Sequence, residues 1–124
     1  MAFPVLKHFP QKDFKHPELM DVGFLLWLET VRTRADVVFV LTSDGRPGDK
    51  GLHGLGMAVD IASRNWTAAQ KWKVAEAVIY FAGTAPGKVE LEMVFNEEPG
   101  KDCHWHLGVD PRPGKQHELV EMDD

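Results

Sequence analysis

Apolar side chains recur with two different periods along the chain, and each period predicts one kind of element. Helical spacing extends from residue 17 to about 34 and again over residues 66–82, which predicts two helices with one buried face each. Thr67 and Gln70 have the spacing of a capping box at the start of the second helix. The buried face expected for this second helix consists of Trp66, Ala69, Trp72, Ala75, Ile79 and Ala82.

Shorter apolar segments have the β-branched content or the alternation that is typical of strands. These predicted strands lie at residues 37–41, 57–62, 89–93 and 103–109. The order helix, strand, strand, helix, strand, strand predicts an α+β fold, in which helices pack on a small antiparallel sheet. We expect a single domain over residues 1–124, with its core at about 17–110 and a polar tail at 111–124.

Composition and charge narrow the class of protein. The net charge of −5 disfavours a nucleic-acid partner, because phosphate binding needs a basic face. The single cysteine, Cys103, cannot form an intrachain disulfide, and we expect it in the core. No apolar run is long enough to span a membrane, and the first residues do not resemble a signal peptide. We therefore expect a monomer that is made in the cytoplasm.

Two histidines and one aspartate offer a metal site. His104 and His106 are two residues apart on a predicted strand, so both side chains face the same side. His53 and Asp60 add a third imidazole and a carboxylate. Two imidazoles and one carboxylate suit Zn²⁺ and leave one position open for water. Two alternatives remain at this point. The histidines can line an exposed sheet face without a ligand, or two of them with the aspartate can hold iron, as in the non-haem oxygenases.

The sequence HGLGMAVD at residues 53–60 resembles a known zinc motif, His-x-x-Gly-x-Ala-x-Asp. This motif occurs in the zinc D-Ala-D-Ala carboxypeptidases, in phage endolysins that are L-alanyl-D-glutamate peptidases, and in the hedgehog signalling domain. A later His-x-His in many members is similar to His104-Trp-His106 here. The resemblance covers roughly residues 17–110, and it implies that His53, Asp60 and His106 are zinc ligands.

The same resemblance implies roles for other polar residues. The loop from Ser43 to Arg46 is similar to a Ser-Gly-Tyr-Arg loop whose arginine holds substrate, so Ser43 and Arg46 are expected at the substrate. His104 is expected to stabilise charge in the transition state. The resemblance also implies an acidic general base shortly before the last ligand; we expect Glu97, with Glu98 and Asp102 as alternatives.

Two departures from the family pattern bear on this expectation. Gly51 replaces a frequent serine, and Cys103 stands where several members have the acid. The expected activity is zinc-dependent hydrolysis of a cell-wall peptide bond next to a D-amino acid, by a carboxypeptidase or an endopeptidase. A small phage or prophage lysin released to the cell wall on lysis fits this expectation, as does a cytoplasmic peptidase for free dipeptides. The alternative is a hedgehog-like domain that binds zinc without catalysis.

Overall fold

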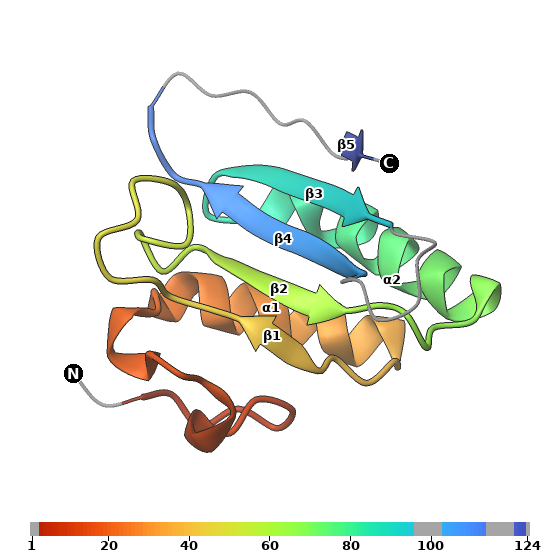
Figure 1. The fold of residues 1–124 in the computed structure, drawn as a ribbon, viewed down its shortest axis with the longest axis horizontal. Helices are drawn as coiled ribbons and strands as arrows, with labels where there is room; N and C mark the ends of the chain where they lie inside the picture. Colours follow the sequence, from red (N-terminus) through yellow and green to blue (C-terminus); the bar gives the residue numbers. More distant parts are fainter. Residues whose placement is uncertain (1–2, 96–102, 114–120, 124) are drawn as a thin grey trace.

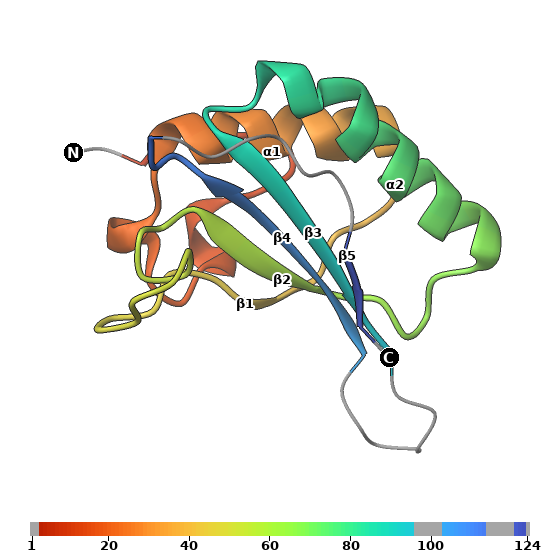
Figure 2. The ribbon, with the colours of Figure 1, turned by 90° about the horizontal axis from the view of Figure 1, so that it is seen from above.

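In the part of the chain that the structure describes, two α-helices lie on one side of a twisted five-stranded sheet, and the other side carries loops (Figures 1 and 2). The computed structural model describes residues 3–95, 103–113 and 121–123. The elements are α1 (Val22–Ala35), β1 (Leu41–Ser43), β2 (Ala58–Ala62), α2 (Ala68–Phe81), β3 (Lys88–Val94), β4 (His104–Asp110) and β5 (Glu121–Asp123), with single 3-10 turns at Gln11–Asp13, Pro17–Leu19 and Ala82–Thr84. The strand order is β1-β2-β4-β3-β5.

The α+β class and the antiparallel sheet are confirmed for β1 to β4, which all pair antiparallel with their neighbours. β5 pairs with β3 in parallel, and it lies in the segment that we predicted to be a tail. We did not predict a strand there, because the few residues of β5 gain their pairing from an edge of the sheet rather than from an apolar pattern of their own.

Both predicted helices are present, with corrected starts. Residues 17–19 form a 3-10 turn, and α1 begins only after Asp21, whose carboxylate accepts a hydrogen bond from the Phe24 amide at 2.9 Å. The capping box of Thr67 and Gln70 is confirmed at the start of α2. The indole Nε1 of Trp27 donates to the Phe81 carbonyl at 2.9 Å, which ties the two helices together.

The face predicted for α2 was partly wrong. Trp72 and Ile79 are 73% and 46% exposed, while the buried side chains of the helix include Val74 and Val78. The face of α2 that packs on the sheet is narrower than its large apolar residues predict. The small and β-branched side chains on this face let the helix approach the sheet closely. Trp72 and Ile79 therefore lie on the solvent side of α2.

The first strand was also misplaced. We predicted it at residues 37–41, but β1 covers Leu41–Ser43. Val37 and Phe39 are buried, and Val38 and Val40 are exposed, so the segment before β1 is extended without regular pairing. Every second side chain of this segment packs on the core. The apolar residues therefore alternate as they do in a paired strand.

Alternation in the central strands separates an apolar face from a polar face. Val59, Ile61, Leu107 and Leu91 are at most 1% exposed and face the helices. The residues between them face the open side of the sheet, and these include Asp60, His104, His106 and Glu92. The described residues contain no helix that is long and apolar enough to cross a membrane.

Candidate metal centre

His53, Asp60 and His106 meet on the open face of the sheet. Each offers one ligand atom, and these atoms lie within 4.8 Å of one another. Asp60 Oδ1 lies 3.2 Å from His53 Nε2 and 3.0 Å from His106 Nδ1. Ligands of a tetrahedral ion with bonds near 2.0–2.1 Å are about 3.3 Å apart, so the two distances from Asp60 Oδ1 are close to this spacing and the donor set suits such an ion. This group could hold a metal ion.

Pairing between β2 and β4 brings together two of the three residues. Asp60 lies directly opposite His106, although 46 residues separate them in the sequence. Directly opposite residues share a face of the sheet, with Cβ atoms about 4.5–5.5 Å apart. A shift of either strand by one residue would turn one of the two side chains towards the helices, so the register itself specifies the site.

His53 comes from the loop before β2, and two glycines give this loop its shape. A Cβ at Gly54 would clash with the Asp49 carbonyl oxygen, and one at Gly56 would clash with the Leu19 carbonyl oxygen. Gly56 also has φ +69°, a left-handed conformation that favours glycine. The loop therefore folds back on itself and carries His53 over the start of β2.

Asp44 holds the ring of His53 in place. His53 Nδ1 donates to the Asp44 carbonyl oxygen at 2.7 Å, which leaves Nε2 on the side of Asp60. Metal-binding histidines usually make such a bond with the nitrogen that is not a ligand. The carboxylate of Asp44 is itself buried and accepts the backbone N–H groups of Lys15 and His16, each at 2.9 Å. The N-terminal arm is thus attached to the residue that orients His53.

Arg46 lies at the edge of the group. Its guanidinium donates to Asp60 Oδ2 at 3.3 Å and to Ser43 Oγ at 2.9 Å. The two oxygens of Asp60 are therefore divided, one facing the histidines and the other facing Arg46. The Arg46 side chain is still 47% exposed, whereas that of Asp60 is 10% exposed. An incoming anion can reach this guanidinium from solvent.

Burial and hydrogen bonding shift the pKa values of Asp60 and His53 in opposite directions. Burial alone would raise the pKa of Asp60, but hydrogen bonds with His106 and His53 outweigh it and hold the pKa well below its ordinary value. Burial alone would lower the pKa of His53, but hydrogen bonds with Asp60 and the Asp44 carbonyl raise it above its ordinary value. The site therefore favours an ionised carboxylate and attracts a cation.

These two shifts predict how the stability of the chelator-treated protein depends on pH. Protonated His53 adds to the free energy of unfolding. This contribution is complete below the unfolded pKa of about 6.5, and it is lost as the pH rises through the higher pKa of the folded state. The contribution of Asp60 is present above about 3.8 and is lost as the pH falls. We expect the free energy of unfolding, measured with urea, to decrease above about pH 6.5. A His53→Asn variant should lack this decrease; an equal decrease in both proteins would contradict the assignment.

The predicted base lies outside this description. Glu97, Glu98 and Asp102 belong to residues 96–102, between β3 and β4, which are not among the described residues. His104 is half-buried on the same face as His106, as the strand parity predicted. Cys103 is buried, at 6% exposure, as expected.

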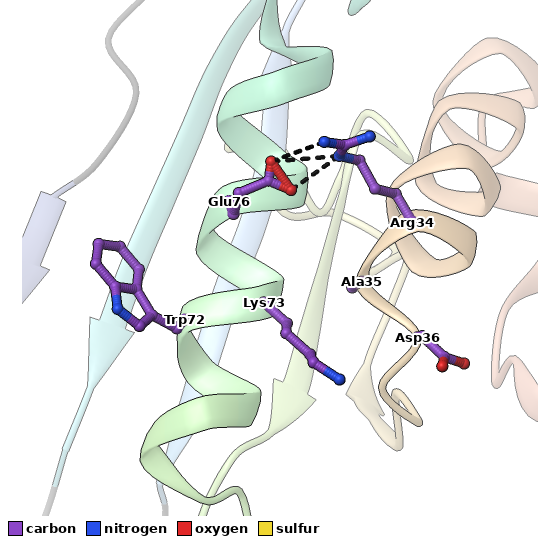
Figure 3. A pocket seen from close by; sticks show the side chains of 6 residues that line it. All are labelled: Arg34, Ala35, Asp36, Trp72, Lys73 and Glu76. Carbon is purple, nitrogen blue, oxygen red and sulfur yellow. Dashed lines mark hydrogen bonds and ion pairs between the residues drawn. The ribbon is translucent and has the colours of Figure 1, made fainter.

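A hollow of about 410 Å³ lies elsewhere, between the end of α1 and the middle of α2 (Figure 3). Arg34 donates to Glu76 across it at 2.8 Å, and Trp72 projects from α2 at its other side. Because both helices pack on the side of the sheet away from Asp60 and His106, this hollow is separate from the metal group. It lacks the convergent imidazole and carboxylate groups that give the open face its chemistry.

No protein family, curated protein or solved structure matched the chain.

Sequence reasoning missed two residues near this group. Asp44 lies inside the Ser43–Arg46 loop that the resemblance singled out, but its role depends on a backbone carbonyl and on contacts with the distant arm. Glu92 lies directly opposite His106 on β3. The alternation of residues 89–93 predicts on which face of the sheet Glu92 lies. Only the register between β3 and β4 shows that Glu92 is opposite His106.

Proposed function

We propose that the chain is a zinc-dependent peptidase that hydrolyses a peptide bond next to a D-amino acid in bacterial cell-wall peptides. Its fold and site would then be those of the D-Ala-D-Ala carboxypeptidase, endolysin and hedgehog group. The observation that carries this proposal is the convergence of His53, Asp60 and His106 on an open sheet face. The proposal also rests on the resemblance of residues 53–60 to the motif of that group.

Zinc is proposed because of the donor set. Two imidazoles and one carboxylate suit Zn²⁺, and three protein ligands are typical of catalytic rather than structural zinc sites. A bound Zn²⁺ would supply Lewis-acid polarisation of a peptide carbonyl and activation of water at neutral pH. Iron shares this donor set, so the metal must be measured on the purified protein.

The surrounding side chains have separate tasks in this proposal. Asp44 fixes the His53 ring so that Nε2 faces the site. Arg46 has exposed N–H groups beside Asp60 and can bind a substrate carboxylate or a polarised carbonyl oxygen. His104, on the same face as His106, can stabilise developing negative charge. An acid from the segment between β3 and β4, Glu97 first, is proposed to accept the proton.

The direct test is hydrolysis of the peptide L-Ala-D-Glu-L-Lys-D-Ala-D-Ala, with the products identified by mass. We expect release of D-Ala or cleavage between L-Ala and D-Glu, loss of either activity with a chelator, and recovery when zinc is added back. Substitution of Glu97 by Gln should abolish turnover while the metal is retained. Absence of cleavage with zinc, iron or another divalent ion would overturn the enzyme proposal.

A second candidate is a binding domain that keeps zinc without catalysis, as in the hedgehog domain. The buried Cys103 favours it, because several members of the group have their acid at this position before the last ligand. Tight zinc binding combined with no cleavage of any wall peptide would support this second candidate.

A further inference from the structure

The open face of the sheet has opposite charges on the two sides of the metal group. Arg46 lies beside Asp60, towards the β1 edge. On the other side of β4, Glu92 pairs directly with His106 and shares its face. A row across the sheet therefore runs from Ser43 through Asp60 and His106 to Glu92.

We propose that Glu92 binds an ammonium group of the substrate, on the amino-terminal side of the cleaved bond. This inference rests on the proposed peptidase function and names the substrate class more closely. The substrate would be a short peptide whose carboxylate pairs with Arg46 and whose ammonium pairs with Glu92. The site would thus fix the direction of the peptide across the strands.

The position of His106 separates Glu92 from the reacting centre. The ring leans towards β2, because its Nδ1 lies 3.0 Å from Asp60 Oδ1, and His53 approaches from the same side. Glu92 belongs to β3, on the far side of β4. Neighbouring strands are about 4.8 Å apart, so the Asp60 and Glu92 backbones are separated by about 10 Å. This separation favours a role in substrate binding over proton transfer.

The same separation suits a peptide. An extended chain advances about 3.3–3.6 Å per residue, so about three residues cover the roughly 10 Å between the Asp60 and Glu92 backbones. Exposure of the ligand side chains increases in the same direction, from 7% for His53 to 20% for His106. A substrate can therefore lie over His106 and extend towards β3.

The charge on Glu92 is available for this contact. Among the described residues, its carboxylate makes no ion pair or hydrogen bond, and the side chain is half-buried. Glu90, two residues away on the same face, differs because its carboxylate lies 3.9 Å from Lys88 Nζ and also acts on the charge of Arg112. Glu90 is opposite Gly108, one step further from His106 along the strand, and it provides a matched control.

The test compares substrates with and without the ammonium group. The probes are L-Lys-D-Ala-D-Ala and L-Lys-L-Ala-D-Glu, one for each proposed specificity, each prepared free, acetylated at the α-amine, acetylated at the ε-amine, and acetylated at both. Wild-type protein loaded with zinc is expected to show a KM about 2- to 5-fold higher when the recognised ammonium is acetylated, as for a partly exposed ion pair. The singly acetylated peptides show whether that group is the α-amine or the side-chain amine.

In Glu92→Gln this penalty should vanish, with kcat on the doubly acetylated peptide unchanged, whereas Glu90→Gln should keep the penalty. Glu92→Lys should reverse the preference and favour a succinylated peptide, which also serves if the glutamine variant folds poorly. A penalty that persists in Glu92→Gln, or a loss of kcat on all the peptides alike, would overturn the assignment while leaving the peptidase proposal intact. A wild-type protein that cleaves neither peptide with any metal would overturn both.

Discussion

Replacement of Asp60 by asparagine is expected to reduce metal affinity by more than about 100-fold. Even mutation of a residue that only hydrogen-bonds to a ligand lowers metal affinity by about 10- to 100-fold. Asp60 carries the negative charge of the group, and its Oδ1 contacts both histidines. Asparagine has the same shape but no charge, so it removes the attraction for a cation with little change in packing. Metal content after dialysis, measured by elemental analysis, gives the result directly.

Activity should fall together with the metal in this variant. The matched control is Asp49→Asn, which removes another carboxylate that contacts Arg46 but lies outside the metal group. Circular dichroism should show that both variants are folded. If Asp60→Asn retained one metal ion per chain with unchanged affinity, the metal centre would have to lie elsewhere.

Replacement of Gly56 by alanine is expected to lower the free energy of unfolding by more than about 2 kcal/mol. Two effects add here: a left-handed conformation at φ +69°, and a Cβ that would meet the Leu19 carbonyl oxygen. The loop must move to relieve the contact, and it carries His53. We therefore expect a weaker metal site as well as a less stable fold.

Two other glycines separate these effects. Gly48 also has a positive φ, +77°, but a Cβ there meets nothing within 4 Å, so Gly48→Ala tests conformational strain alone and should cost about 1 kcal/mol. Gly83 has neither feature, and Gly83→Ala should be nearly neutral. Urea unfolding of the three variants gives the order; equal stabilities for Gly56→Ala and Gly83→Ala would contradict the close approach of residue 56 to Leu19.

The parts of the fold that the sequence predicted are those set by local patterns. Both helices, the strands β2 to β4 and the shared face of His104 and His106 follow from apolar spacing and strand parity. β1 and β5 could not be placed in this way. Alternating burial gave residues 37–40 the pattern of a strand, although they lie outside the regular ladder and only enter it through the Val40 carbonyl, which accepts from the Ala62 amide. β5 depends on an edge offered by distant residues.

The candidate site shows the same division. A motif identified His53, Asp60 and His106, and the structure brings all three together. The role of Asp44 uses its backbone carbonyl, which every residue has, so no side-chain pattern indicates it. Glu92 became relevant only through the register of β3 with β4, which the sequence does not specify.

The origin of the three ligands from a loop and two strands has a thermodynamic consequence. Asp60 and His106 become neighbours only when β2 pairs with β4, so an unfolded chain does not contain the assembled site. Any ion that binds this group therefore adds its binding free energy to that of folding, about 4 kcal/mol at a free concentration 1,000 times the Kd. An ion bound at this group would therefore raise the fraction of folded chains, and its removal would lower the resistance of the chain to proteolysis.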